Sequence, residues 1–181
     1  IISNNFNKLN FKDDFIELKD FNDSNHIFIV GLPRSGSTLI ETIISHNAKK
    51  IVSVGEFHAI NSSILEQIGN IIYSKDFDLK NYKLSLNKKI FQNSIFNKYD
   101  NFEKKIYLDK SLENFFNIEI ILEFFPNAKF IHTYRSTNDA IIGIHQTLLT
   151  ELSWSHNIKD IKNYVKIYNN AIDYFKEKYP N

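Results

Sequence analysis

The sequence contains no cysteine, and this absence excludes disulfide bonds and any chemistry that needs a thiolate. A phosphatase loop built around a nucleophilic cysteine is therefore excluded as well. Long apolar runs are also missing, because the most hydrophobic stretch, 118–125, is interrupted by Glu119 and Glu123. The formal net charge of +1 provides no general attraction to nucleic acid or to an anionic membrane. We therefore expect a cytoplasmic protein with no membrane span and no nucleic-acid partner.

Methionine is absent too, and the chain of 181 residues begins at Ile1. We expect a fragment or a trimmed product of a longer protein. Residues 1–25 are polar, lack a clear hydrophobic period and are interpreted as a lead-in segment. Residues 26–181 are long enough for one domain with a real core, which we expect to be truncated at its C-terminal end.

Arginine is scarce in a chain that otherwise uses lysine for positive charge. Of the 22 basic residues, only Arg34 and Arg135 are arginines. A guanidinium group is planar and presents a fork of donors that matches phosphate and sulfonate oxygens, which an ammonium group cannot reproduce. The scarcity therefore marks these two positions as candidates for anion binding.

Short apolar runs alternate with stretches of helical period along most of the chain. Such alternation favours an α/β fold of the P-loop type, a three-layer sandwich in which helices flank a mainly parallel sheet. The expected strands are His26–Val30, Ile51–Val54, Ile106–Leu108 and Ala128–Tyr134. The expected helices are Thr38–His46, much of 57–103, Asn114–Phe125, Asn138–Thr150 and Ile158–Tyr179.

Three segments rich in polar residues follow the expected strands, at the edge where such sheets bind ligands. They are Gly31–Thr38, Asp109–Lys110 and Arg135. In parallel sheets the ligand lies beyond the carboxyl ends of the strands. The coincidence of all three at this edge predicts a single site there.

The first of these segments nearly matches the nucleotide-binding P-loop, with Gly31 and Gly36 at the required spacing. Backbone N–H groups and a helix N-terminus converge in such a loop, which suits a phosphate or a sulfate group. Ser37, however, stands where the P-loop lysine is expected. The nearest cation is Arg34, on the other side of the loop. A turn that merely caps a helix is the plainer alternative.

The segment VGLPRSGSTLIETIISHN at 30–47, followed by Gly55–Glu56, resembles the 5′-phosphosulfate loop of sulfotransferases that use 3′-phosphoadenosine 5′-phosphosulfate (PAPS). LDKSLENF at 108–115 and FPNAKFIHTYRSTNDA at 125–140 resemble two further segments of the same family, in the same order. The similarity is greatest to the bacterial group that is often fused to tetratricopeptide repeats and is also similar to tyrosylprotein sulfotransferases. The resemblance implies PAPS as co-substrate, no metal, and tetratricopeptide repeats upstream of this chain.

The resemblance also implies how the donor is bound. Arg34 would contact the sulfonate and the 5′-phosphate, and residues Ser35, Gly36, Ser37 and Thr38 would cradle that phosphate. Arg135 would bind the 3′-phosphate of PAPS. Gly143 stands where the family has a serine that shares this phosphate, so the hydroxyl is missing here.

Two further residues are implied to take part in the transfer itself. Lys110 would offset charge near the bridging oxygen of the donor, and Glu56 would remove the proton of the acceptor. His58, two residues beyond Glu56, is the competing base. Both Glu56 and Lys110 have a plainer interpretation as solvated surface residues.

We therefore expect a sulfotransferase that moves a sulfonate group from PAPS to an acceptor hydroxyl or amine by metal-independent in-line transfer. The sequence does not specify whether the acceptor is a carbohydrate, peptide, lipid or small molecule. A P-loop small-molecule kinase or NTPase is one alternative. A non-catalytic nucleotide-binding module is another, consistent with the missing hydroxyl at Gly143.

Overall fold

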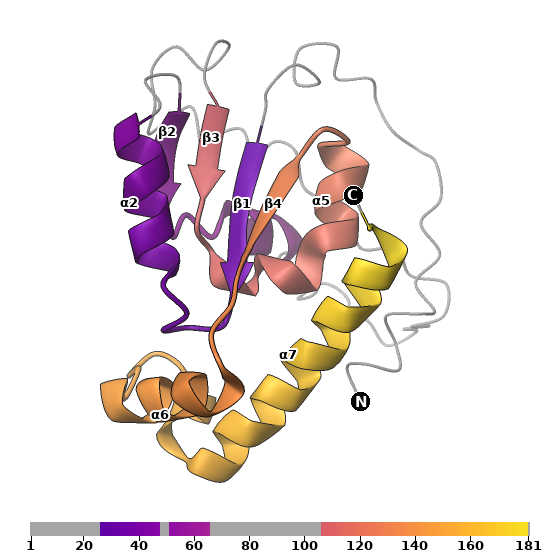
Figure 1. Ribbon diagram of the computed structural model, residues 1–181. Coiled ribbons are helices and arrows are strands. Elements are labelled where there is room, and N and C mark those ends of the chain that lie inside the picture. Colours follow the sequence, from indigo (N-terminus) through magenta and orange to yellow (C-terminus); the bar gives the residue numbers. More distant parts are fainter. Residues whose placement is uncertain (1–25, 48–50, 66–105, 181) are drawn as a thin grey trace.

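The computed structural model describes residues 26–47, 51–65 and 106–180, and within them four strands form one sheet (Figure 1). The strands are β1 (His26–Gly31), β2 (Ile51–Gly55), β3 (Ile106–Asp109) and β4 (Lys129–Thr133). Their order is β2-β3-β1-β4, and every neighbouring pair is parallel. The prediction of an α/β fold with a mainly parallel sheet is confirmed. The expected lead-in 1–25 and most of the expected helices in 57–103 lie outside the described residues.

The helices connect the strands in the order that crossover connections between parallel strands require. They are α2 (Ser37–Asn47), η2 (Leu112–Asn117), α5 (Ile118–Phe124), α6 (Thr137–Thr147), η3 (Ser153–His156) and α7 (Ile158–Lys178), where η marks 3₁₀ geometry. Residues 59–65 are helical as well. None of the described helices combines the length and apolar character needed to cross a membrane.

Two of the predicted helices differ in detail from the structure. The segment expected as one helix, Asn114–Phe125, is a 3₁₀ turn followed by α5, because Asn117 leaves the helical conformation with φ −109° and ψ 10°. Helix α6 ends at Thr147 rather than Thr150, since Leu148 adopts a left-handed conformation with φ 45°. Left-handed geometry cannot continue a right-handed helix.

Strand β1 runs through the centre of the core. Phe28 and Val30 join the main hydrophobic cluster, and Ile29, which points to the opposite face of the sheet, is also fully buried. Burial on both faces is typical of a parallel strand with helices on either side. Helix α2 contacts β1 and β2, whereas α7 contacts β4 through a hydrogen bond between Tyr168 and His132.

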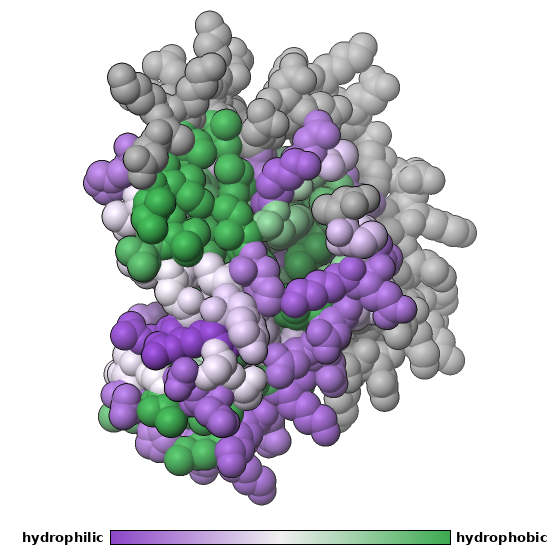
Figure 2. All heavy atoms as spheres, viewed as in Figure 1, coloured by the Kyte–Doolittle hydropathy of each residue, from purple (hydrophilic) through white to green (hydrophobic). Residues whose placement is uncertain are grey.

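The apolar stripe that predicted helix α2 is only partly buried. Figure 2 shows a hydrophobic surface on the side of the molecule where α2 lies. Leu39 and Ile43 are exposed, whereas Ile40 and Ile44 are half-buried. The side of the stripe that carries Leu39 and Ile43 therefore faces away from the sheet.

His26 is buried at the start of β1 among aromatic rings. Its ring centroid lies 4.2 Å from that of Phe125 and 5.7 Å from that of Tyr107. Burial lowers the pKa of His26 from 6.5 to about 4. Between pH 6.5 and pH 4, His26 therefore binds a proton in the unfolded chain but not in the folded protein. The free energy of unfolding falls as the pH drops through this range.

We expect the free energy of unfolding of the parent to fall by about 2 kcal/mol between pH 7 and pH 4.5 because of His26 alone. His26→Phe has no such titrating group. In this variant the free energy of unfolding should therefore change between pH 7 and pH 4.5 by about 2 kcal/mol less than in the parent. Denaturant unfolding at both pH values measures it, with the exposed His46→Gln as control. An unchanged pH dependence in His26→Phe would contradict the assignment.

Candidate active site

Predicted site residues follow the carboxyl end of each of the four strands. The loop 32–36 follows β1, Glu56 follows β2, Lys110 follows β3 and Arg135 follows β4 shortly after its end. The backbone N–H of Lys110 donates to the carbonyl of Gly55 at 2.9 Å, which extends the pairing of β2 and β3 to this edge. The parallel sheet thus brings residues far apart in the sequence to one edge.

The loop after β1 has an unusual backbone. Arg34 adopts φ 67° and Gly36 φ 94°, so a non-glycine residue as well as a glycine occupies the left-handed region. Such a conformation is costly for arginine and is held by its surroundings. Gly31 is required for a different reason, because a Cβ atom there would lie 2.3 Å from the hydroxyl oxygen of Thr133.

Hydrogen bonds of the Ser35 hydroxyl connect this loop to the sheet. The hydroxyl donates to the carbonyl of Leu32 at 2.6 Å and lies 2.7 Å from Thr133 Oγ1 on β4. A serine has one hydroxyl proton, and here that proton is used inside the loop. The contribution that Ser35 can make to a phosphate is therefore its backbone N–H, not its hydroxyl.

Ser37 and Thr38 begin helix α2, and their hydroxyl groups have no hydrogen-bond partner among the described residues. The first intrahelical bond at this end runs from the N–H of Ile40 to the carbonyl of Gly36. The N–H groups of the preceding residues in the first turn have no intrahelical acceptor. Donors from the backbone and from two hydroxyls therefore gather at the positive end of the helix.

The two arginines of the chain lie together at this edge. Arg135 Nη1 donates to the backbone carbonyl of Arg34 at 3.4 Å, although the residues are 101 positions apart. Both side chains are exposed. The structure therefore places Arg135 beside the loop that carries Arg34, and their role in binding an anion stays a prediction.

Gly143 on α6 packs against the arginine of the loop. A Cβ atom at this position would lie 3.3 Å from Arg34 Cβ and 3.7 Å from Arg34 Cγ. That approach is closer than most Cβ contacts, so the glycine permits α6 to lie directly beside the stem of Arg34. Position 143 therefore meets the loop through a close contact with Arg34 and carries no hydroxyl that could bind a ligand.

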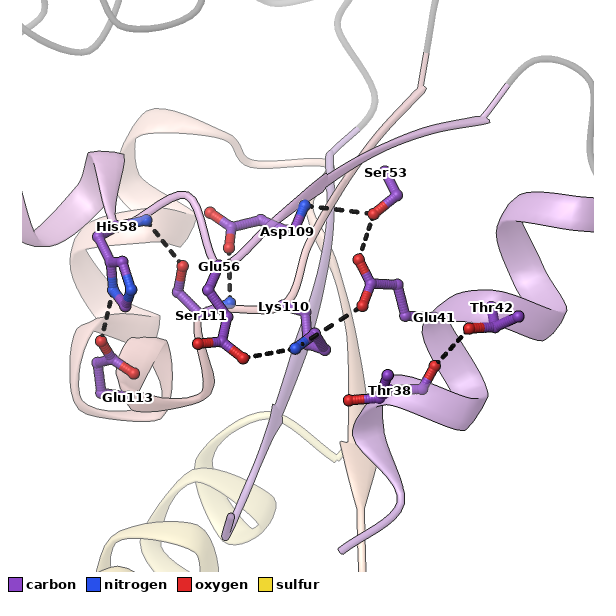
Figure 3. Close-up of polar contacts among 11 residues, drawn as sticks. Thr38, Glu41, Thr42, Ser53, Glu56, His58, Asp109, Lys110, Ser111 and Glu113 are labelled. Carbon is purple, nitrogen blue, oxygen red and sulfur yellow. Dashed lines mark hydrogen bonds and ion pairs between the residues drawn. The ribbon is translucent and has the colours of Figure 1, made fainter. Parts of the chain in front are cut away.

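Lys110 and Glu56 are brought into direct contact (Figure 3). Lys110 Nζ lies 2.5 Å from Glu56 Oε1, and the lysine side chain is only 9% exposed, whereas that of Glu56 is 57% exposed. A buried ammonium group needs a negatively charged partner. The second carboxylate oxygen of Glu56 has no partner among the described residues and remains available to a ligand.

A hydrogen-bonded turn holds Lys110 in place. The carboxylate of the preceding Asp109 is buried and accepts a hydrogen bond from the N–H of Ser111 at 2.7 Å. Burial raises the pKa of Asp109, and the hydrogen bonds from Ser111 oppose this shift. Ser111 in turn accepts a hydrogen bond from the N–H of His58, which connects the turn to the segment after Glu56.

His58 is better placed for proton transfer than the sequence indicated. Its Nδ1 lies 2.7 Å from Glu113 Oε1, so the Nδ1–H group donates a hydrogen bond to the carboxylate. In the neutral imidazole with this tautomer, the lone pair is on Nε2, which can act as an acceptor. His58 and Glu113 therefore form an oriented pair, and the imidazole is half-exposed.

A cavity of about 430 Å³ lies between the loop after β1 and these residues. Glu56, His58 and Glu113 line it, together with Pro33 of the loop, and residues 147–152 after α6 close another side. The volume falls within the range of small-molecule sites. Both candidate bases therefore face the same cavity.

Glu41 was not predicted from the sequence. It lies on α2, and its Oε2 is 3.7 Å from Lys110 Nζ, while its Oε1 accepts a hydrogen bond from Ser53 (Figure 3). One signal was available: Glu41 is a lone carboxylate within the apolar stretch of α2. An acidic residue in such a place is retained for a specific partner.

No group of three or more His, Asp or Glu residues that could hold a metal ion occurs within ranges 26–47, 51–65 and 106–180. The arrangement described here can bind an anion at the loop and the arginines. It also presents a carboxylate and an imidazole to a neighbouring cavity.

The model of the sulfotransferase family matches residues 26–181. The chain belongs to the sulfotransferase family. Among solved structures, the chain is similar to the crystal structure of sulfotransferase STF9 from Mycobacterium avium, with 13% sequence identity and a TM-score of 0.49. The match covers 87% of this chain and spans 57% of that protein. No curated protein matches the sequence.

For this member of the sulfotransferase family we expect Ser35→Ala to lower the free energy of unfolding by about 1 kcal/mol. The carbonyl of Leu32 and the hydroxyl of Thr133 each lose a partner in this variant. Thr38→Ala removes an exposed hydroxyl that has no partner and serves as the matched control, with an expected change below about 0.5 kcal/mol. Equal stability of the two variants in denaturant unfolding would show that Ser35 does not anchor the loop.

Proposed function

We propose that the protein transfers a sulfonate group from PAPS to the hydroxyl or amine of an acceptor without a metal ion. The observation that carries this proposal is the contact between Lys110 and Glu56 beside the loop after β1. A cation suited to the leaving group and a base suited to the acceptor are thus joined at the edge where ligands bind. Membership of the sulfotransferase family supports the same reaction.

The donor would be held by the loop and the two arginines. The free N–H groups of the first turn of α2 and the hydroxyls of Ser37 and Thr38 suit the 5′-phosphate. Arg34 suits the sulfonate and the same phosphate, and Arg135 suits the 3′-phosphate, because both can form forked hydrogen bonds. Gly143 would contribute no hydroxyl to this phosphate and would act through its contact with Arg34.

In the transfer, the bond between sulfur and the bridging oxygen of the donor breaks as a bond between sulfur and the acceptor atom forms. The acceptor's proton passes to Glu56, and the electron pair of the broken bond remains on the phosphate of the departing nucleotide. Lys110 offsets the charge that develops there. The acceptor would occupy the cavity lined by Glu56 and His58, where its hydroxyl or amine can approach the base.

The pairing of His58 with Glu113 favours a second candidate for the base. With Nδ1 donating to Glu113, the imidazole is oriented by a carboxylate, and Nε2 of His58 would accept the proton of an acceptor in the cavity. Glu56 remains our first choice because it contacts Lys110 directly. The two residues can be separated by experiment, since neither is the partner of the other.

A kinase or another P-loop NTPase is the main rival from a different class of enzyme. The loop lacks the P-loop lysine that reaches terminal phosphates, because Ser37 stands at that position. A non-catalytic nucleotide-binding module is the rival outside enzymes. Which nucleotide the protein binds distinguishes a kinase or NTPase from our proposal. Whether the protein transfers sulfonate distinguishes a non-catalytic binding module from it.

We expect the product nucleotide, adenosine 3′,5′-bisphosphate, to raise the melting temperature of the full-length protein in the absence of magnesium. Arg34→Lys and Arg135→Lys keep the charge but lose the forked donors, and each should weaken binding by about 1–3 kcal/mol. Lys129→Gln, at the opposite end of β4, is the control and should bind as the parent does. Stabilisation by magnesium-ATP alone would favour the kinase or NTPase.

We expect Glu56→Gln to reduce sulfonate transfer on the order of 10²–10⁴-fold, since the amide cannot take a proton. Its affinity for the bisphosphate should stay close to that of the parent. Transfer from labelled PAPS to a panel of alcohols, phenols and amines measures this, with His58→Gln as the matched variant in the same cavity. Normal transfer by Glu56→Gln together with loss in His58→Gln would assign the base to His58. Tight bisphosphate binding without any transfer by the parent would favour the binding module.

A further inference from the structure

Glu41 and Glu56 both approach the ammonium group of Lys110, but their surroundings differ. The carboxylate of Glu56 is 57% exposed, whereas that of Glu41 is 15% exposed and bonded to Ser53. We propose that Glu41 is a positioning residue: it is the fixed counter-ion that balances the charge of Lys110 and keeps its side chain in place while Glu56 takes the acceptor's proton. This inference rests on the proposed function, because the role it assigns belongs to sulfonate transfer.

The first argument concerns charge. A base that accepts a proton becomes neutral, and Glu56 would then no longer balance Lys110. An unpaired ammonium group in a buried position is strongly disfavoured. Glu41 carries a second negative charge at 3.7 Å, so Lys110 keeps a counter-ion throughout the transfer. With Glu41 present, the three groups carry a total charge of −1 before the proton arrives and zero afterwards.

The second argument concerns geometry. Glu56 lies within hydrogen-bond distance of Lys110 Nζ, but Glu41 at 3.7 Å attracts the ammonium group without accepting a hydrogen bond from it. An ammonium group has three N–H donors. Glu41 therefore stabilises the charge of Lys110 and leaves donors free for the oxygen of the departing phosphate.

The third argument concerns how Glu41 itself is held. Ser53 on β2 donates its proton to Glu41 Oε1 and accepts a hydrogen bond from the N–H of Gly55 at 3.2 Å (Figure 3). Gly55 immediately precedes Glu56. Helix α2, the end of β2 and Lys110 are thus connected through one carboxylate, and the position of the lysine is coupled to the strand that carries the base.

The test is Glu41→Gln in the full-length protein. The amide keeps the size of the side chain and can still accept a hydrogen bond from Ser53, so only the charge is removed. We expect kcat for transfer to fall about 10–100-fold while affinity for adenosine 3′,5′-bisphosphate changes less than about threefold. A role in stability alone would not lower kcat of the folded enzyme at unchanged nucleotide affinity.

A second measurement does not depend on catalysis. The rate at which Lys110 reacts with an acylating reagent, located by mass spectrometry, should rise several-fold in Glu41→Gln, because the ammonium group loses its fixed partner. Glu119→Gln is the matched control, since Glu119 is 11% exposed and pairs with Lys178 away from the site. That variant should raise the reactivity of Lys178 and leave Lys110 and kcat unchanged.

Ser53→Ala provides a further variant in case Glu41→Gln does not fold. Ser53→Ala keeps the carboxylate of Glu41 but removes the hydrogen bond that orients it. We expect kcat to fall by a smaller factor than in Glu41→Gln. If Lys110 reactivity and kcat in both variants equal those of Glu119→Gln, Glu41 has no positioning role. If the parent itself transfers no sulfonate, the proposed function is wrong and the role of Glu41 fails with it. Transfer by the parent that is unaffected in Glu41→Gln overturns the role of Glu41 alone.

Discussion

A buried ammonium group must keep a negatively charged partner, and at Lys110 this requirement connects three separate elements of the fold. One carboxylate comes from the end of β2 and the other from α2, and the lysine itself follows β3. Glu41 is nearly as buried as the lysine, whereas Glu56 is 57% exposed, so the buried part of this charge balance lies between α2 and the residue after β3. The relative positions of β2, β3 and α2 at the carboxyl edge are therefore constrained by charge as well as by backbone pairing.

A second constraint acts between β1 and β4. The close approach of these strands leaves no room for a Cβ atom at Gly31, and it allows the hydroxyl of Thr133 to meet Ser35. The loop is thereby fixed to β4, which also ends next to Arg135. The same contact sets the loop and the strand that leads to the second arginine, so backbone packing brings Arg34 and Arg135 to the same edge, where Arg135 also donates a hydrogen bond to the Arg34 carbonyl.

Much of this arrangement was predictable from local sequence. Short apolar runs identified all four strands, two of which end at a glycine, and the scarcity of arginine identified two residues that prove to be neighbours. Glu41 was missed because its partner, Lys110, is 69 positions away. No sequence pattern within α2 indicates that the helix packs next to the residue after β3. The contact of Ser35 with Thr133 was missed for the same reason, since the two residues are 98 positions apart. Local pattern predicts elements, whereas side-chain partners depend on how the elements pack.

The departure from the family pattern at Gly143 can be understood together with the unusual backbone of Arg34. A side chain at 143 would press on Arg34 Cβ, and Arg34 has little freedom to move away because its φ of 67° lies in a narrow allowed region. The glycine on α6 and the left-handed arginine in the loop therefore depend on each other. A glycine at 143 offers no hydroxyl to the donor that we propose, but it lets α6 support the stem of the arginine that we place at the sulfonate. In this chain the helix contributes to the site through contact with Arg34 rather than through a hydrogen bond of its own.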